Sequence, residues 1–281
     1  MTNSAVTREP RLAEALPDLA AWTTHFHAAT IPVLSQTAQA LEALRANEDL
    51  VDANSIGEMI SGDPLMTLKV MAHVAANRSS RVVTDTETVT SALVLIGISP
   101  FFRAFGPQPT VEERLADLPD ALEGLTDTMR RAHRGANFAL GFAVHRMDHD
   151  AAVIHAAALL HDFAELLLWC HAPALALRIR QAQRADSTLR SSIAQRAVLS
   201  IELADLQQSL MKAWRLPELL IRINDDRHAE DPSVRTVMLA VRLARHTAQG
   251  WDNAALPDDI DDIASLLNLS TDATLQLVRD I

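Results

Sequence analysis

Hydrophobic residues recur every three or four positions along most of the chain, a spacing typical of amphipathic helices. The pattern is clearest in two stretches, which carry Leu34, Ala38, Leu41 and Leu44, and then Leu65, Leu68, Ala72 and Ala75. Similar spacing continues into the second half of the sequence. The pattern therefore predicts one helix after another and an all-α fold.

Two of the predicted helices begin with the same dipeptide. Asp63-Pro64 and Asp231-Pro232 each place a capping carboxylate before a proline, whose missing N–H does no harm in the first turn of a helix. The second start is followed by an apolar stripe of Val234, Val237, Val241 and Ala244. We expect this stripe to face the core and the helix to end near Gly250.

Three other segments indicate how the helices are organised. Residues 1–23 are predicted to form an N-terminal tail and a helix, because Leu12, Leu16, Leu19 and Trp22 lie at helical spacing. Residues 229–281 are predicted to add at least two helices that pack on the core. Between residues 106 and 120, prolines and a glycine interrupt the pattern. We interpret this interruption as a connection between two helical groups of one domain.

Composition and charge exclude several classes of function. Aromatic residues make up 4% of the chain and Tyr is absent, which favours helices over strands. A formal net charge of −11 argues against direct nucleic-acid binding, because phosphate backbones attract a basic face. We find no signal peptide and no stretch of 18 uninterrupted apolar residues, so we expect no membrane insertion and a cytoplasmic location. The single cysteine, Cys170, is assigned to packing.

Charge is unevenly distributed along the second half of the chain. A basic region carries Arg178, Arg180, Arg184, Arg190 and Arg196, and an acidic region carries Asp252, Asp258, Asp259, Asp261 and Asp262. The simpler interpretation is two solvated faces, which could also meet each other. The alternative is a docking surface for an acidic partner.

The dipeptide His161-Asp162 interrupts the apolar stretch AALLHDFAELLLW. Two such polar groups in a helical core need partners, because an unpaired buried polar group costs roughly 1–3 kcal/mol. The partners are either a metal ion or hydrogen bonds, and the choice between them decides the function.

The residues around this dipeptide resemble a known family. His133 lies on an earlier predicted helix, which gives the order His, then His-Asp, of the HD hydrolase superfamily. Between residues 24 and 228 the sequence is similar to the HDOD family, the HD-related output domain. Five segments carry this resemblance in order: IPVLSQTAQAL, SGDPLMTLKVMAHVAAN, TSALVLIGISPFFRAF, AALLHDFAELLLW and LMKAWRLPELL.

The resemblance implies an HD-domain-like multi-helix bundle in two packed helical groups, and a non-enzymatic bacterial signalling module. It also implies where the catalytic relatives hold further metal ligands. Those positions correspond here to Leu203, Arg227-His228 and Val241. Leu and Val cannot bind a metal, and Arg227 would place a positive charge where a second cation should lie. The lysine or arginine expected soon after the dipeptide is replaced by Phe163-Ala164-Glu165.

Two interpretations of the remaining polar residues stay open. His133, His161, Asp162 and His228 could form a vestigial site for one divalent ion such as manganese, iron or zinc. We prefer the interpretation in which His161 and Asp162 make hydrogen bonds that hold two helices in register. We accordingly expect no catalytic residue, no cofactor and no metal.

The sequence thus predicts a regulatory module that binds an unidentified signalling protein or a small signal, with a cyclic dinucleotide as one candidate. The alternative is a metal-dependent phosphohydrolase that acts on a nucleotide or cyclic dinucleotide through His133, His161 and Asp162.

Overall fold

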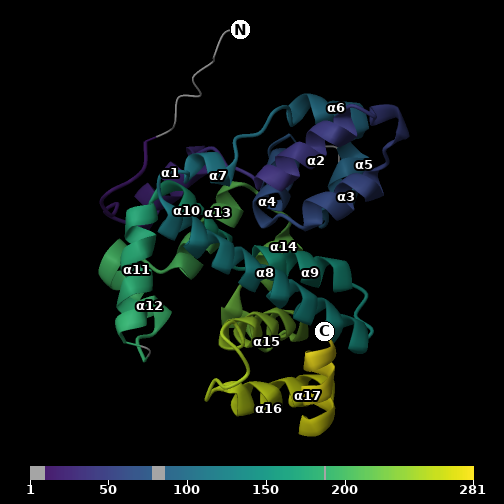
Figure 1. The fold of residues 1–281 in the computed structure, drawn as a ribbon. Coiled ribbons are helices and arrows are strands. Elements are labelled where there is room, and N and C mark those ends of the chain that lie inside the picture. The colour runs from purple at the N-terminus through teal and green to yellow at the C-terminus, as the bar shows by residue number, and fades with distance from the viewer. Residues whose placement is uncertain (1–9, 78–85, 187) are drawn as a thin grey trace.

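The computed structural model describes residues 10–77, 86–186 and 188–281, and these ranges fold into helices as the sequence predicts (Figure 1). The first group of helices lies in the upper part of Figure 1. It contains α1 (Leu19–Ala28), α2 (Ser35–Arg45), η1 (Glu48–Leu50), α3 (Ala53–Ser61), α4 (Pro64–Ala76), α5 (Val89–Ile96), α6 (Ile98–Ala104) and α7 (Val111–Arg114).

The second group starts with the long helix α8 and continues to the C-terminus. It contains α8 (Pro119–His145), α9 (Ala151–Leu160), α10 (Phe163–His171), α11 (Pro173–Ala185), α12 (Ser191–Leu199), α13 (Leu203–Ala213), α14 (Glu218–Ile223), η2 (Asp226–His228), α15 (Pro232–His246), α16 (Leu256–Leu267) and α17 (Thr271–Asp280). The two groups pack together through α1, which contacts α13, and through α4, which contacts α9 and α10. The predicted bundle of two packed helical groups is therefore confirmed.

Both proline-started helices begin where the sequence predicts. The Asp63 carboxylate accepts hydrogen bonds from the backbone N–H groups of Leu65 and Met66, at 2.9 and 3.1 Å. It is fully buried and also accepts from the N–H of Leu34, so it ties α4 to the chain before α2. At the start of α15, Asp231 accepts from the N–H of Ser233.

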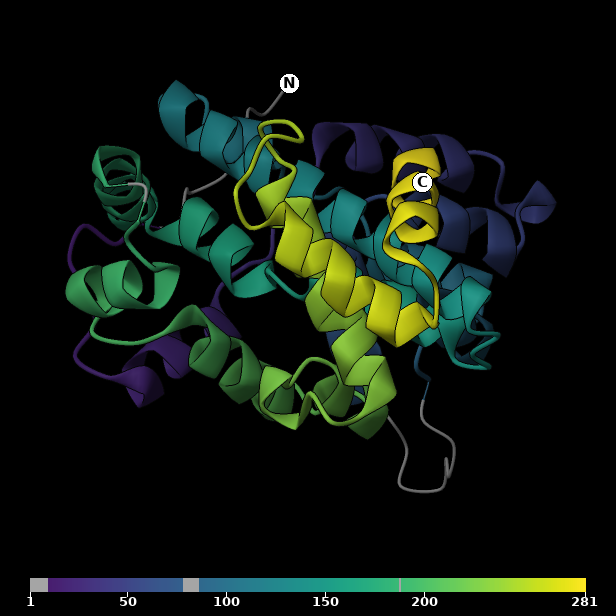
Figure 2. The ribbon, with the colours of Figure 1, turned by 90° about the horizontal axis from the view of Figure 1, so that it is seen from below.

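Helix α8 is the central support of the second group. It packs against α9 and α10 on one side and against α15 on another, as Figures 1 and 2 show. Close approach depends on glycines, since Gly124 lies against the Trp169 ring and Gly135 lies against Val241. Val241 is buried, as expected for the apolar stripe of α15.

The N-terminal helix begins later than its hydrophobic spacing predicts, and it runs to Ala28. Residues 10–18 are not helical, and α1 begins only at Leu19, where Asp18 caps it by accepting from the N–H of Ala21. Pro17 explains the late start, because a proline disfavours helical geometry in the residue before it. Residues 1–9 of the predicted tail lie outside the described ranges.

The connection between the two groups is held to the first group. The N–H of Val33 donates to the carbonyl of Pro109, and the N–H of Val111 donates to the carbonyl of Val33. Within residues 106–120, α7 forms a single helical turn before α8 begins at Pro119.

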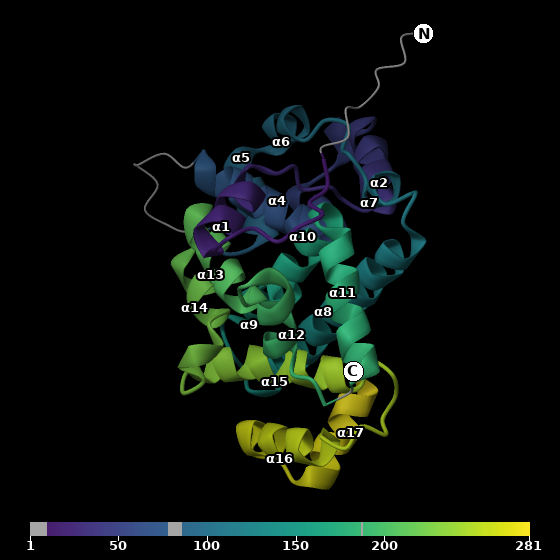
Figure 3. The ribbon, with the colours of Figure 1, turned by 90° about the vertical axis from the view of Figure 1, so that its left-hand side faces the viewer.

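The last helices pack outward from α15, with α16 on α15 and α17 on α16 (Figure 3). The buried carboxylate of Asp259 forms an ion pair with Arg242 at 2.7 Å and a hydrogen bond with His246 at 2.6 Å. The acidic region thus meets α15.

Among the described residues, one helical stretch is long and apolar enough to cross a membrane. It covers residues 151–171, and 61% of its most apolar window is buried inside the fold. Such burial is typical of a core helix, which is how α9 and α10 are placed here.

Candidate functional site

His161 and Asp162 form the turn between α9 and α10. His161 caps the end of α9, and Asp162 precedes the first residue of α10. Their side chains are only 14% and 10% exposed, so both need polar partners. The turn therefore places two adjacent, nearly buried titratable groups among packed helices.

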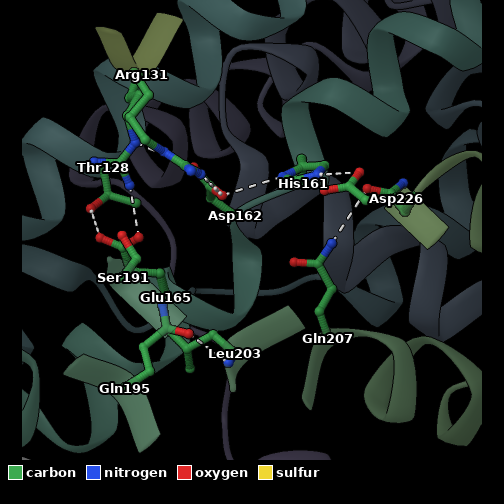
Figure 4. Close-up of polar contacts among 12 residues, drawn as sticks. Thr128, Arg131, His161, Asp162, Glu165, Ser191, Gln195, Leu203, Gln207 and Asp226 are labelled. Carbon is green, nitrogen blue, oxygen red and sulfur yellow. Dashed lines mark hydrogen bonds and ion pairs between the residues drawn. The ribbon is translucent and has the colours of Figure 1, made fainter. Parts of the chain in front are cut away.

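Both ring nitrogens of His161 face carboxylates. Nδ1 lies 3.3 Å from Asp162 Oδ1, and Nε2 lies 3.2 Å from Asp226 Oδ1 (Figure 4). Burial alone would lower the pKa of His161, but hydrogen bonds to Asp162 and Asp226 raise it to about 9. The ring is therefore an imidazolium at neutral pH, with both nitrogens acting as donors.

Asp162 receives positive charge from three directions. Besides His161, Arg131 donates from Nε to Oδ2 at 3.3 Å, and Arg245 Nη2 lies 3.7 Å from Oδ1. Burial would raise the pKa of Asp162, but the hydrogen bond from His161 and the two arginine charges lower it. The carboxylate is ionised and fully engaged by cations.

Arg131 links this turn to the body of α10. Its Nη2 pairs with Glu165 Oε2 at 2.7 Å, and the Thr128 hydroxyl donates to Glu165 Oε1 at 2.8 Å. Trp169 Nε1 in turn donates to the Thr128 hydroxyl at 3.2 Å. Figure 4 shows Arg131 directed toward Asp162. The chain of contacts then runs from Asp162 through His161 to Asp226. This network joins α8, α10 and η2.

The other two candidate ligands lie elsewhere. His133 is two residues beyond Arg131 on α8, hydrogen-bonds the backbone of Gly62 and lies near Asp63; burial lowers its pKa. His228 has a side chain that is 56% exposed and lies 3.3 Å from Glu230. The structure brings His161 and Asp162 together but places His133 and His228 with other partners.

The positions matched to further ligands in catalytic relatives also have other roles. Leu203 is buried at the start of α13, and Val241 packs on Gly135 of α8. Arg227 is exposed and pairs with Asp225 at 2.7 Å.

These residues do not fit the divalent metal that the HD superfamily implies. A ligating imidazole needs a nitrogen lone pair that no other group occupies, whereas both nitrogens of His161 already lie within hydrogen-bond distance of carboxylates. Asp162 already faces two guanidinium groups, which would repel a cation. Within the described ranges, no three His, Cys, Asp or Glu side chains converge as a metal site requires.

Sequence reasoning missed Arg131, although a signal for it was present. Residues two apart on a helix lie about 200° apart around the axis, so Arg131 and His133 cannot both face the same turn. The segment MRRAHR offered both, and the family resemblance favoured the histidine. A buried carboxylate at Asp162 needs a positively charged partner, and this need pointed to the arginine instead.

The turn formed by His161 and Asp162, called the HD turn below, lies in the wall of a large cavity. The cavity has a volume of about 1050 Å³ and is lined by residues of α8, α11, α12, α13 and α15. The basic region divides around it: Arg180, Arg184 and Arg190 line the cavity, while Arg178 is exposed outside it. Part of the predicted basic region therefore lines this cavity.

A comparison with protein families agrees with the helix order. The sequence model of the HDOD domain matches residues 31–230. No protein with a curated description matches the chain significantly.

Three solved structures share the fold at low sequence identity. The MmoQ response regulator from Methylococcus capsulatus strain Bath is 18% identical with a TM-score of 0.65, covering 90% of this chain and 99% of that one. A virulence factor from Campylobacter jejuni is 15% identical with a TM-score of 0.61, covering 93% and 97%. An HDOD domain protein from Geobacter sulfurreducens is 14% identical with a TM-score of 0.50, covering 93% of each chain.

Proposed function

The chain belongs to the HDOD domain family, and from that premise we propose that it is a non-enzymatic regulatory module in bacterial signal transduction. It acts in the cytoplasm by binding a signalling protein or a small signal. The description of the similar Methylococcus capsulatus protein as a response regulator supports this class of role.

The engagement of Asp162 by Arg131 carries the proposal. In a metal-dependent phosphohydrolase this carboxylate would bind the cation that activates water. Here a guanidinium that also pairs with Glu165 lies in hydrogen-bond range of Asp162, and His161 is charged. The dipeptide therefore serves to hold α8, α10 and η2 together, and we expect neither a metal cofactor nor turnover.

The division of the fold supports a mechanism in two parts. The cavity beside the HD turn receives the signal, and the first helical group, which packs on α9 and α10 through α4, presents the output surface. A change at the cavity wall would reach that surface through these packed helices.

The proposal is tested by metal content and hydrolysis. The full-length chain is incubated with manganese, iron or zinc, freed of excess ion and measured by elemental mass spectrometry, beside Asp162→Asn. Asp258→Asn, an exposed change on α16, serves as the matched control. We expect no stoichiometric metal in any of the three and no phosphate release from nucleotides or cyclic dinucleotides.

Stoichiometric metal that Asp162→Asn alone removes, accompanied by turnover, would replace the proposal with the phosphohydrolase alternative. Affinity capture from lysate with mass spectrometry then addresses the partner. Failure to enrich any specific protein or small molecule, at good yield of folded chain, would count against a regulatory role.

A further inference from the structure

The cavity beside the HD turn differs in charge from the rest of the molecule. Its lining carries eight arginines and seven carboxylates, whereas the whole chain has a formal net charge of −11. An acidic protein thus concentrates cationic side chains in one recess, where they attract an anion.

When these charges are paired, positive charge is left over in the cavity lining. Most lining carboxylates face a cationic side chain, as Asp127 faces Arg180, Glu165 faces Arg131 and Asp225 faces Arg227. The positive charge that remains is carried by other arginines.

Three lining arginines, Arg134, Arg184 and Arg190, have no carboxylate within ion-pair distance in the described part of the chain. Arg134 is held in place on α8, because its Nη1 donates to the carbonyl of Thr247 at 2.7 Å and its guanidinium lies over the Phe138 ring. Its remaining N–H groups stay available to a ligand.

Arg184 and Arg190 come from another part of the wall. Arg184 lies near the end of α11 and Arg190 caps the start of α12, and both side chains are exposed. Figures 1 and 2 both show this helix pair at one edge of the molecule. A ligand that meets all three arginines must therefore contact α8 and the α11–α12 region together.

The charge of the lining indicates the charge of the ligand. Eight arginines and seven carboxylates leave a net charge of +1, and a phosphate monoester carries about −1.5 to −2 charge at neutral pH, so one phosphate group is enough to balance it. Planar guanidinium groups bind phosphate oxygens with paired hydrogen bonds. The cavity, at about 1050 Å³, is slightly larger than typical small-molecule sites, which measure roughly 300–1,000 Å³.

We infer that this cavity binds a small organic molecule carrying one or more phosphate groups, contacted by Arg134 from α8 and by Arg184 and Arg190 from the α11–α12 region. This inference rests on the proposed function, because it names the chemical class of the signal that the module receives.

Calorimetric titration of the full-length chain tests the inference, at about 150 mM salt so that diffuse attraction is screened. The probes are inorganic pyrophosphate, guanosine triphosphate, cyclic di-GMP and uncharged adenosine. We expect binding of at least one phosphate probe and none of adenosine. The double variant Arg184→Gln/Arg190→Gln should weaken that binding about tenfold or more, because it removes charge-assisted hydrogen bonds.

The matched control is Arg103→Gln/Arg178→Gln, which removes the same charge from exposed positions outside the cavity lining. We expect this control to bind as the unmodified chain does. Equal weakening in both double variants, or no binding of any phosphate probe by folded protein, would overturn the inference. So would tighter binding of an acidic peptide such as polyglutamate than of every phosphate probe.

The same experiment separates the two proposals. If no phosphate probe binds while a specific protein partner is still captured, the ligand class is wrong and the regulatory function stands. If a phosphate probe binds and is hydrolysed, the cavity inference stands and the non-enzymatic function is wrong.

Discussion

At the scale of single residues, His161 and Asp162 illustrate how a motif can keep its residue types while the side chains that contact it differ from those of a metal site. The carboxylate that could bind a cation is in contact with Arg131 and His161, and lies 3.7 Å from Arg245. Removing one member of such a buried set leaves the others with uncompensated charge. Substitutions in this set should therefore change the free energy of unfolding rather than any turnover.

Asp162→Asn should lower the free energy of unfolding by about 3 kcal/mol, the size of effect seen when one partner of a buried ion pair is lost. The control is Asp226→Asn, whose side chain is 48% exposed and which should cost under about 1 kcal/mol. Urea unfolding followed by circular dichroism measures both. Equal effects of the two substitutions would show that the set is not held as described.

The charge of His161 gives a pH dependence. A pKa raised to about 9 from its ordinary value near 6.5 means that His161 stabilises the fold fully below pH 6.5, and that this contribution is lost as pH rises through 9. The difference in unfolding free energy between the unmodified chain and His161→Gln should shrink by about 3 kcal/mol between pH 6 and about pH 9.5. Urea titrations of both proteins across this range measure it.

Comparison with His161→Gln is necessary because other groups titrate in the same range. Burial lowers the pKa of Lys69 to about 8, so its contribution to stability changes with pH in the opposite direction. Lys69 is present in both proteins and cancels in the difference. A difference that stays constant from pH 6 to 9.5 would mean that His161 is neutral in the folded state.

The residues show which parts of the site the sequence could predict. Asp63 and Asp231 were predictable as caps, because capping depends only on neighbouring backbone N–H groups. Arg131 was not predicted, because its role depends on how α8 is rotated relative to α10. The pairing of His161 with Asp226 joins residues 65 positions apart and left no local signal.

At the scale of elements, α8 contributes by its small residues as much as by its length. Gly124 lets the Trp169 ring of α10 lie directly on the helix backbone. That ring in turn donates to Thr128, which supports Glu165 and so Arg131. Helix packing and the polar network thus depend on the same close approach.

Gly124→Ala should therefore destabilise the protein, by about 1–3 kcal/mol, because the added methyl overlaps the buried Trp169 ring. The matched control is Gly141→Ala on the same helix, where the methyl meets only the side-chain end of the terminal Ile281. That residue can move aside, so the control should gain up to about 1 kcal/mol of helix propensity. Thermal unfolding of both variants measures the contrast, and stabilisation by Gly124→Ala would contradict the α8–α10 packing.

Elements also differ in how well the sequence predicts them. Helices α4 and α15 begin at their predicted residues, because an aspartate and a proline mark each start. The helix expected from Leu12 begins only at Leu19, since hydrophobic spacing continued across Pro17 while the backbone could not. Periodicity shows which face of a segment is apolar, and capping chemistry shows where the helix begins.

At the scale of the whole molecule, the family match and the packed core have different limits. The match ends at residue 230, whereas α15 packs on α8 and α9 in the interior of the second group. Val234, Val237 and Val241 of α15 are all buried. Helix α15 thus shares its buried face with the second group, and truncation can test how far the cooperative core extends.

A chain ending at residue 230 should lose cooperative unfolding, and a chain ending at residue 250 should keep it. Burying one large apolar side chain contributes about 1.5–3 kcal/mol, so the three valines of α15 alone approach the roughly 5–15 kcal/mol stability of a typical domain. The longer chain keeps them and loses only α16 and α17, which pack outside α15. The midpoint of its thermal unfolding should fall, because α15 loses the cover of α16 and the pairing of Arg242 and His246 with Asp259.

Circular dichroism during heating compares both shortened chains with the full-length chain. A cooperative transition at an unchanged temperature in the shorter chain would mean that residues 229–281 form a separate unit.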